Sequence, residues 1–361
     1  MRILHLPTSV GGNAYGLSRG ERAMGHTSEV LVTEENFFNY PADHVLFSRP
    51  SSCRMQSWLR RARLFKTFLS IRNAYDVFHF NFGQSLLHFE RLGLPFLELP
   101  FYSGKAKIIV TYNGCDARQK FKTIEMNPYA PCHDPNCYGG VCNSGKKDMG
   151  RWKAIARMNK YAHMIFALNP DLLHVLPGRA RFLPYTVAAW NDIASLPIQQ
   201  MRSPLRIAHA PTNRVAKGSD AVFSAIEQLQ REYGQHIEFV LIEGVSYKEA
   251  LALYASADLV IDQLRIGWYG GLAVEAMKMG RPVVVYIREE DLHFIPRPMA
   301  EQLRDAVFNA TETTLLNTLR GIVENPHVLH EKANAGLAYV HQWHDPVKVA
   351  AISLEAYGDC V

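Results

Sequence analysis

The sequence of 361 residues lacks any long apolar run. No stretch of about 18 apolar residues is present, so we expect no membrane-spanning helix. The segment Met1–Pro7 is too short and too polar for a secretory signal, and no small-residue cleavage site follows it. The six cysteines do not form the dense disulfide framework of a small secreted domain. We therefore expect a cytoplasmic protein.

The sequence also has little excess charge. Its 39 basic and 34 acidic residues leave a formal net charge of +5, which does not argue for a nucleic-acid partner but suits phosphorylated ligands. Two ligand signatures are missing as well. There is no Gly-x-Gly-x-x-Gly fingerprint, which disfavours NAD, and there is no Asp-x-Asp pair. We expect no cofactor and no catalytic metal.

Short apolar runs alternate with helix-length segments along most of the chain, a pattern typical of βαβ units around buried parallel sheets. In the first half the expected strands are Arg2–Leu6, Glu29–Thr33, Asp76–Phe80, Lys107–Tyr112, Met164–Leu168 and Arg181–Pro184. In the second half they are Leu205–His209, Ile237–Ile242, Asp258–Ile261 and Pro282–Tyr286. Helices are expected at Ser219–Tyr233, Tyr247–Tyr254, Leu272–Met279 and throughout the tail after Asn309.

The two series predict two α/β domains, as the length of the chain also does. The irregular segment Thr186–Ser203 separates them and is interpreted as the linker. We predict Rossmann-like domains over residues 1–190 and 204–345, and a terminal helix over 346–361 that packs back toward the first domain. In such doubly wound units, ligands bind at the carboxyl ends of the strands.

Two glycines follow the first expected strand. Gly11 and Gly12 precede Asn13 and a helix rich in small residues. Glycine lets the backbone approach a ligand closely, and a helix start offers N–H groups to an anion. A tight turn without any ligand explains the same pair.

The segment His209–Gly218 lies between an expected strand and an expected helix. It brings the cations Arg214 and Lys217 to the carboxyl end of the strand, where they would neutralise a diphosphate without a metal. The alternative is a solvated basic loop.

The segment Asp262–Val283 also begins where a strand ends. Gly270 and Gly271 open a helix, and Glu275 lies one turn into it. The helix amides would hold phosphate or sugar oxygens, and the carboxylate would accept two hydrogen bonds from a ribose diol. A charge that complements the helix dipole is the alternative for Glu275, but it leaves two glycines beside two aromatic residues unexplained.

These two segments resemble the carboxyl-terminal domain of glycosyltransferase family 4, a large family of retaining enzymes with the GT-B fold. The stretch from Gly11 to His26 resembles the family's first loop and helix. Asp76–Phe80 is similar to its fourth-strand region, and Phe166–Leu173 to the end of its first domain. The resemblance implies two Rossmann-like domains that face a central cleft. It also implies metal-independent transfer of a sugar from a nucleotide sugar to a hydroxyl group, with retention of configuration.

Carried over by position, the resemblance assigns roles in both halves of the chain. Arg214 and Lys217 would bind the donor diphosphate and act in catalysis, with Asn113 as a further catalytic candidate. Glu275 would hold the ribose of the donor. The remaining candidates are Gly12, Gly270 and Gly271 on the donor side, and Asn13, His79 and Asp116 on the acceptor side.

The sequence departs from the family at two positions. The family signature is a pair of glutamates separated by seven residues, and here the first position is Gly267 and the second Glu275. The loop at Asn113 often carries a histidine in the family, whereas an amide hydrogen-bonds a hydroxyl without carrying charge. These departures bear on sugar identity and turnover more than on nucleotide binding.

Two alternatives to sugar transfer remain. A nucleotide-sugar epimerase with the GT-B fold would bind the same kind of donor without an acceptor. A non-catalytic nucleotide-sugar-binding module would fit the changes at Gly267 and Asn113. The transferase reading implies a saccharide or lipid-linked acceptor, in glycan, polysaccharide or glycolipid synthesis.

A dense cysteine loop lies outside these motifs. It contains Cys132, His133, Cys137 and Cys142, and Cys115 precedes it. Thiolates and imidazole are zinc ligands, so a structural zinc is one interpretation. The spacing lacks a Cys-x-x-Cys pair, and in a reducing location the thiols are instead free or redox-active.

A basic and aromatic stretch runs from Arg54 to Arg72. Its apolar residues recur at alternating spacings of three and four, so they form one helical stripe. We expect the stripe to pack on a sheet and the cations to be solvated. The alternative is a surface for anionic lipid or a lipid-linked acceptor, which gives a peripheral membrane contact. The stripe consists of Met55, Trp58, Ala62, Phe65 and Leu69, and the cations include Arg60, Arg61, Arg63 and Lys66.

Overall fold

The chain forms two compact units, which the computed structural model describes over residues 1–35, 37–48, 54–89, 95–102, 104–196 and 203–358. The side chains of residues 54–56 are not described. Unit 1 consists of Met1–Arg118, Met149–Ala189 and Asp345–Val361, and unit 2 consists of Gln119–Asp148 and Trp190–His344. Each unit has its own parallel sheet.

The sheet of unit 1 has seven strands in the order β3-β2-β1-β4-β5-β6-β7, and all neighbouring pairs are parallel. The strands predicted in the first half are all present, with small shifts at their ends. The one that the analysis missed is β3, a short strand at the edge of the sheet whose residues are half-buried or exposed. The bounds are β1 (Arg2–Leu6), β2 (Thr27–Glu34), β3 (His44–Phe47), β4 (Val77–Asn81), β5 (Lys107–Tyr112), β6 (Met164–Ala167) and β7 (Arg181–Phe182).

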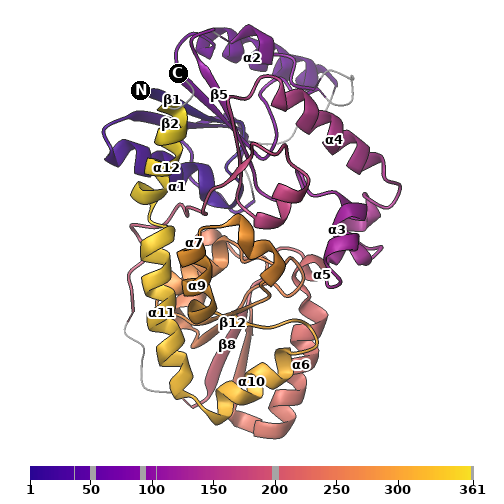
Figure 1. Cartoon of the computed structure of the whole chain (residues 1–361), viewed down its shortest axis with the longest axis vertical. Helices are drawn as coiled ribbons and strands as arrows, with labels where there is room; N and C mark the ends of the chain where they lie inside the picture. The colour runs from indigo at the N-terminus through magenta and orange to yellow at the C-terminus, as the bar shows by residue number, and fades with distance from the viewer. Residues whose placement is uncertain (36, 49–53, 90–94, 103, 197–202, 359–361) are drawn as a thin grey trace. The chain divides into compact units, whose positions relative to one another are not determined.

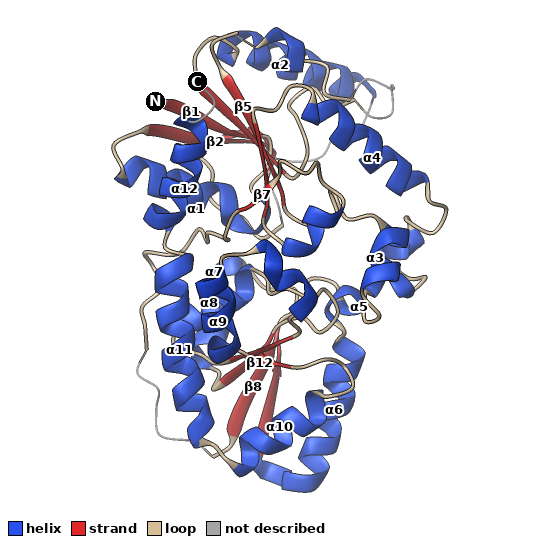
Figure 2. Cartoon of the chain, viewed as in Figure 1, coloured by secondary structure: helices blue, strands red, loops and turns tan. Residues whose placement is uncertain are grey.

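Helices cover both faces of this sheet (Figures 1 and 2). Alternate side chains of a strand point to opposite faces. Leu4 of β1 and Phe78 of β4 accordingly pack in one core cluster, which α2 (Arg54–Ile71) and α4 (Lys146–Asn159) cover. Ile3 of β1 packs in the other cluster, beneath α1 (Asn13–Ala23) and α12 (Pro346–Gly358).

The last helix, α12, packs closely on α1. A Cβ atom added to Gly20 of α1 would lie 1.9 Å from the carbonyl oxygen of Pro346, so only glycine permits this approach. The contact places the described part of the predicted terminal segment within unit 1, while residues 359–361 lie outside the described residues.

The sheet of unit 2 has five strands in the order β12-β11-β10-β8-β9, again parallel throughout. The four strands predicted in the second half are present, whereas β12 has two residues and is too short for a pattern to reveal. Their bounds are β8 (Leu205–His209), β9 (Ile237–Leu241), β10 (Leu259–Ile261), β11 (Val283–Val285) and β12 (Phe308–Asn309). Two parallel sheets with helices confirm the predicted α/β class.

The helices predicted in the second half are present, including the helical tail, whereas those at Lys120–Met126, Arg214–Lys217 and Arg297–Ala306 were not predicted. The helices of unit 2 are α3 (Lys120–Met126), α5 (Arg214–Lys217), α6 (Ser219–Tyr233), α7 (Tyr247–Ser256), α8 (Gly271–Lys278), α9 (Arg297–Ala306), α10 (Leu315–Glu324) and α11 (His327–Trp343). Among the described residues, no helix combines the length and the apolar character that crossing a membrane requires.

The division into units differs from the predicted ranges at one segment. Residues 119–148 come from the predicted first domain, 1–190, but belong with unit 2. The predicted linker Thr186–Ser203 falls partly outside the described residues, at 197–202. Apolar periodicity does not report this division, because the pattern shows where elements lie along the chain but not which sheet a loop packs on.

The expected packing of the apolar stripe on α2 is wrong. Trp58, Phe65 and Leu69 are 67%, 51% and 47% exposed. The helix instead packs on the core through Phe68 and Ile71, which lie on a second face. Sequence spacing identified a stripe correctly but could not tell which of two apolar faces is buried.

Candidate functional site

The loop after β8 carries the first predicted pair of site residues. Asn213 caps the short helix α5 by accepting a hydrogen bond from the N–H of Ala216 at 2.9 Å. Arg214, the first residue of α5, donates two hydrogen bonds to the carboxylate of Glu243, at 2.8 and 2.6 Å. The guanidinium is largely exposed and therefore accessible, but a diphosphate must displace or share Glu243 to reach it. Sequence reasoning missed Glu243.

Lys217 lies at the other end of α5 and turns toward β10. Its ammonium donates to Asp262 Oδ1 at 2.6 Å, and the backbone N–H of Gly270 donates to Asp262 Oδ2 at 2.7 Å. The structure thus brings Lys217 and Gly270, predicted from separate segments, to one carboxylate. The side chain of Lys217 is 14% exposed, and that of Asp262 is fully buried. Asp262 was not predicted, although its position directly after a buried strand was a usable signal.

Glu275 lies in α8, which begins at Gly271, and is buried. Its Oε1 accepts a hydrogen bond of 2.5 Å from the hydroxyl of Tyr247, the first residue of α7. Burial raises the pKa of Glu275 to about 8, with the hydrogen bond from Tyr247 acting against this shift and the charge of Asp262 adding to it. The environment thus favours the neutral acid more than water does, and the ribose-binding role of Glu275 stays a prediction.

His209 is the last residue of β8, and its hydrogen bonds connect the segments that form the site. Its Nδ1 lies 2.9 Å from the carbonyl oxygen of Ile261 in β10, and its Nε2 lies 2.8 Å from the hydroxyl of Ser219 at the start of α6. Burial lowers the pKa of His209 to about 4. A neutral, fully buried imidazole thus joins two strand ends to a helix start and fixes the loops that carry Lys217 and Asp262.

Gly267 stands where the family that the sequence resembles has its first glutamate, and the structure leaves little room for a side chain there. Gly267 has a φ of +86°, a conformation that other residues rarely adopt, and an added Cβ would lie 2.9 Å from Cβ of Arg288. The neighbouring Trp268 and Tyr269 are 1% and 0% exposed and stack on each other with ring centroids 4.4 Å apart. These two aromatic residues therefore pack in the core of unit 2.

The segment 119–148 packs on the same loop. Asn127 Nδ2 donates to the carbonyl oxygen of Arg265 at 3.0 Å, and Tyr129 contacts Tyr286 edge to face at 5.3 Å between ring centroids. His133 Nε2 lies 3.1 Å from the carbonyl oxygen of Asn127, so this candidate zinc ligand has a partner within its own segment. The cysteine loop therefore belongs to the surroundings of the β10–α8 loop.

In unit 1, the two glycines after β1 have different surroundings. Gly11 and Gly12 both have positive φ, 62° and 71°. A Cβ added to Gly12 would lie 2.8 Å from Cβ of Ala188, whereas one added to Gly11 meets nothing within 4 Å among the described residues. Packing on Ala188 thus accounts for Gly12, and the donor role remains a prediction.

Asn13 begins α1 and is buried. Its Oδ1 accepts the N–H of Thr186 at 2.9 Å, and the Thr186 hydroxyl donates to the carbonyl oxygen of Asn13 at 2.7 Å. The Nδ2 group has no partner among the described residues, and neither has the buried hydroxyl of Ser9. Buried polar groups without partners are uncommon, and the acceptor role of Asn13 stays a prediction.

Asp116 shapes the loop after β5. Its carboxylate accepts the backbone N–H groups of Asn113, at 3.1 Å, and of Gly114, at 2.6 Å. Burial raises the pKa of Asp116 to about 6, against the opposing effect of these hydrogen bonds. The loop holds Asn113 with its Oδ1 buried and without a partner among the described residues. Asp116 is thus a loop anchor, and the catalytic role of Asn113 and the acceptor role of Asp116 stay predictions.

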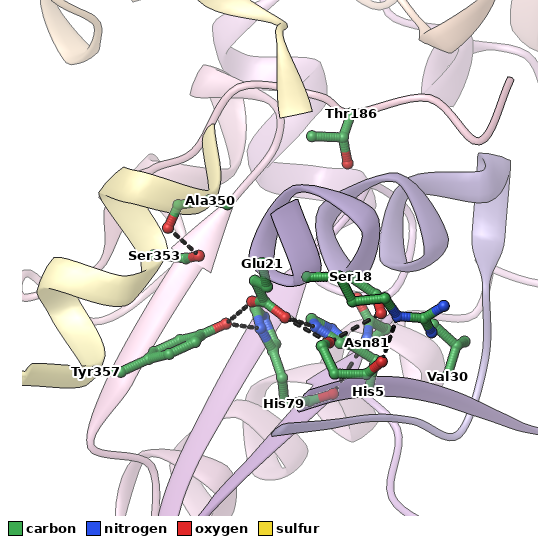
Figure 3. Close-up of polar contacts among 12 residues, drawn as sticks. His5, Ser18, Glu21, Val30, His79, Asn81, Thr186, Ala350, Ser353 and Tyr357 are labelled. Atoms are coloured by element: carbon green, nitrogen blue, oxygen red, sulfur yellow. Dashed lines mark hydrogen bonds and ion pairs between the residues drawn. The ribbon is translucent and has the colours of Figure 1, made fainter. Parts of the chain in front are cut away.

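The acceptor role predicted for His79 does not agree with its position. The residue is fully buried between the β-sheet, α1 and α12 (Figure 3). Its Nδ1 lies 2.7 Å from Tyr357 Oη, and its Nε2 lies 2.6 Å from Thr111 Oγ1. Tyr357 in turn donates to Glu21 at 2.9 Å. Burial lowers the pKa of His79 well below its usual range. Apolar periodicity gives no information on the burial of a polar residue, so it could not show that this histidine lies on the inner face of the sheet.

Potential metal ligands gather at one place in the described chain. His5, Glu21 and His79 bring ligand atoms within 4.8 Å of one another, and His5 Nε2 lies 2.8 Å from Glu21 Oε2. Both nitrogens of His79 are hydrogen-bonded, so the cluster is accounted for as a polar network that joins α1 and α12 to the sheet. Cys132, Cys137 and Cys142 form no comparable group among the described residues.

Solved structures with the same fold are numerous. The sucrose-phosphate synthase of Thermosynechococcus elongatus is 16% identical, with a TM-score of 0.59 and 99% of each chain covered. The catalytic domain of starch synthase IV from Arabidopsis thaliana, solved with ADP and acarbose, is 10% identical, with a TM-score of 0.59, over 100% of this chain and 99% of that one. The UDP-GlcNAc 2-epimerase from Neisseria meningitidis, bound to UDP-GlcNAc, is 14% identical, with a TM-score of 0.55, over 99% and 100%.

These likenesses show that the chain has the GT-B fold, with two Rossmann-like domains, as predicted. No protein-family model and no curated protein matches the sequence. The resemblance to glycosyltransferase family 4 in particular is therefore not confirmed. At these identities the comparisons concern the fold, which glycosyltransferases and nucleotide-sugar epimerases share.

Proposed function

We propose that this GT-B chain transfers a sugar from a nucleotide sugar to a hydroxyl acceptor, with retention of configuration and without a metal. The observation that carries the proposal is the convergence of Lys217, Asp262 and the start of α8 at the ends of β8 and β10, with Glu275 one turn further. A cation beside a helix start is suited to a diphosphate. The proteins of this fold solved with UDP-GlcNAc or with ADP support a nucleotide ligand.

Within this proposal, the leaving diphosphate lies between Lys217 and the first turn of α8. Lys217 has further N–H donors besides the one that Asp262 accepts. Arg214 reaches the same phosphates once Glu243 releases it. Both cations stabilise the negative charge that develops as the glycosidic bond breaks, so they act more strongly on the transition state than on the bound donor.

Glu275 then binds the ribose hydroxyls. As a neutral acid it donates one hydrogen bond and accepts another, and as a carboxylate it accepts two. The neighbouring Tyr247 hydroxyl holds one of its oxygens in place. We propose that donor binding ionises Glu275, because a diol with two donors favours the carboxylate.

Unit 1 supplies polar groups suited to a hydroxyl acceptor. Ser9 Oγ, Asn13 Nδ2 and Asn113 Oδ1 are buried and lack partners among the described residues. They follow β1 and β5, which are separated in the sheet by β4 alone. Sugar hydroxyls both donate and accept hydrogen bonds, so they would satisfy this mixed set.

A turnover assay tests the proposal. The chain is incubated with UDP-, ADP- and GDP-sugars, with and without a panel of saccharide acceptors, and products are identified by NMR. Transfer to an acceptor with the donor's anomeric configuration supports it, and an inverted product overturns the retaining mechanism. Conversion of the sugar without an acceptor instead identifies an epimerase, which the similarity to UDP-GlcNAc 2-epimerases favours as the second candidate. Nucleotide binding without any turnover identifies a binding module.

A further inference from the structure

Helix α2 presents an apolar surface to solvent. Trp58, Phe65 and Leu69 are 67%, 51% and 47% exposed, and Ala62 between them is exposed as well. Their spacings of four, three and four residues place them in one stripe along the helix. Phe68 and Ile71 are buried on an adjacent face of the helix. The exposed stripe is therefore not part of the core of unit 1.

The charge of α2 has one sign only. The helix contains five cations and no Asp or Glu. Arg61 follows Trp58 by three residues and Lys66 follows Ala62 by four, so they flank the stripe on either side. Within the described part of the chain, Arg61, Arg63 and Lys66 form no ion pair, whereas Arg60 pairs with Glu34 at 2.5 Å.

A second helix of the same kind covers the same face of the sheet. The buried residues of α4, Ile155 and Met158, belong to the core cluster that also contains Phe68 of α2. On the outer side of α4, Met149 and Trp152 are 57% and 59% exposed. The part of α4 that belongs to unit 1, from Met149 to Asn159, contains three further cations, Arg151, Lys153 and Arg157, and no Asp or Glu. One face of unit 1 thus combines exposed aromatic rings with cations on two helices.

We infer that this face, led by α2, binds the surface of an anionic lipid bilayer. An apolar stripe flanked by cations matches the boundary between acyl chains and negatively charged headgroups. Neither helix combines the length and the apolar character that crossing a membrane requires, so the contact is interfacial. A nucleic acid would engage the cations but would leave Leu69 and Phe65 without a role. The inference does not depend on sugar transfer.

Vesicle sedimentation of the full chain tests this inference. The probes are vesicles of phosphatidylcholine alone and vesicles with about one third phosphatidylglycerol. The charge variant is Arg61→Gln/Arg63→Gln/Lys66→Gln, and the apolar variant is Trp58→Ser/Phe65→Ser/Leu69→Ser. The matched charge control is Lys122→Gln/Arg231→Gln/Arg297→Gln, which removes three cations from unit 2 whose side chains are 50%, 73% and 90% exposed.

The wild type and the control are expected to bind the anionic vesicles and not the neutral ones. The charge variant should bind on the order of 100-fold more weakly, since each cation at an anionic surface contributes about fivefold. The apolar variant should lose binding on the order of 10-fold or more. Circular dichroism checks that the variants are folded.

Three results overturn the inference. One is the absence of binding to anionic vesicles by the folded wild type. Another is equal loss in the charge variant and its control, which would indicate a general charge effect. The third is a wild type that is dimeric in light scattering and does not bind vesicles, together with an apolar variant that is monomeric. This result would identify the face as an interface between copies of the chain. Binding of an RNA or DNA duplex at higher affinity than vesicles also counts against lipid.

Discussion

Lys217 and Asp262 form an ion pair of 2.6 Å between loops that follow two neighbouring strands, β8 and β10. The side chain of Asp262 is fully buried, and it also accepts a hydrogen bond from the N–H of Gly270 at the start of α8. One carboxylate therefore positions both the cation and the helix start that we propose for the donor diphosphate. Activity and stability are consequently coupled at this point of the fold.

Replacement of Lys217 by alanine should lower both the activity and the stability of the protein. The change leaves the buried Asp262 carboxylate without its cation, which costs up to about 3–5 kcal/mol in comparable buried pairs, and less here because Lys217 is partly exposed. It also removes a charge-assisted hydrogen bond to the diphosphate, which is worth roughly 10–100-fold in rate. Urea unfolding and steady-state kinetics with varied donor measure the two effects.

The double variant Lys217→Ala/Asp262→Asn separates the effect on stability from the effect on catalysis. It removes the buried charge together with its partner, so stability should largely return while turnover stays low. Wild-type donor kinetics in Lys217→Ala would show that the diphosphate binds elsewhere.

Arg214 should behave differently from Lys217. Because its pair with Glu243 is largely exposed, Arg214→Ala should leave the unfolding midpoint nearly unchanged. Catalysis should still fall by roughly 10–100-fold if Arg214 meets the leaving phosphate. Glu243→Gln releases the guanidinium and should improve donor binding. An Arg214→Ala enzyme that matches the wild type at every donor concentration would remove Arg214 from the site.

The raised pKa of Glu275, about 8, predicts that donor binding depends on pH. If the diol favours the carboxylate, the KM for the donor should fall as pH rises through about 8. Glu275→Gln cannot ionise and should show a flat KM profile over the same range. Donor titrations from pH 6 to 9 on both proteins test this, and parallel profiles would contradict it.

The same group makes stability depend on pH. Its pKa is near 4.5 when unfolded and about 8 when folded, so between these values the unfolded state loses the proton that the folded state keeps. The wild type should therefore lose stability relative to Glu275→Gln as pH rises from about 5 to 8, and the difference should level off above that. Melting temperatures of the unliganded proteins at each pH measure it.

Restoring the family's first carboxylate should not restore a family-like site. Gly267→Glu forces a non-glycine residue to a φ of +86° and brings its Cβ to 2.9 Å from that of Arg288. We expect a loss of stability of about 1–3 kcal/mol, and Gly267→Ala should lose nearly as much. Gly321→Ala is the matched control, since its added Cβ meets nothing within 4 Å among the described residues and the position is helical. Equal melting temperatures for all three variants would contradict the strain.

Sugar transfer should survive chelation. Lys217, Arg214 and the start of α8 supply positive potential for the diphosphate, so activity with EDTA should equal activity without it. Recovery by magnesium or manganese of an activity lost to EDTA would contradict the metal-independent mechanism. Recovery by zinc alone would point to the loop that carries Cys132, Cys137 and Cys142.

The sequence predicted the parallel strands well because their apolar runs are a local property. Each long strand, such as Lys107–Tyr112, is present at the expected place. What apolar periodicity could not predict is which surface an element contacts. The stripe of α2 has the spacing of a buried face, yet Phe68 and Ile71 are the residues that the core accepts. The segment 119–148 likewise packs by shape and hydrogen bonding that no spacing reveals.

The site was predictable in part for a similar reason. Strand ends identified Lys217, Gly270 and Glu275, and the structure brings Lys217 and Gly270 together at Asp262. The partners Glu243 and Tyr247 were missed because they come from other loops and carry no motif of their own. His79 was assigned by resemblance to the family, which gives no information on burial in this chain, and the structure places it in a buried polar network.

The chain passes between the two units at residues 118–119, 148–149, 189–190 and 344–345, so neither unit is a continuous piece of sequence. During synthesis, residues 119–148 leave the ribosome long before residues 190–344, on which they pack. At roughly 5–20 residues per second, this segment waits about 10–40 s for its partners. Until then, the residues that pack on the later segment, such as Asn127 and Tyr129, are open to solvent. Nascent chains should accordingly need chaperone protection in this interval, and truncation at residue 190 should yield an insoluble fragment, not a folded domain.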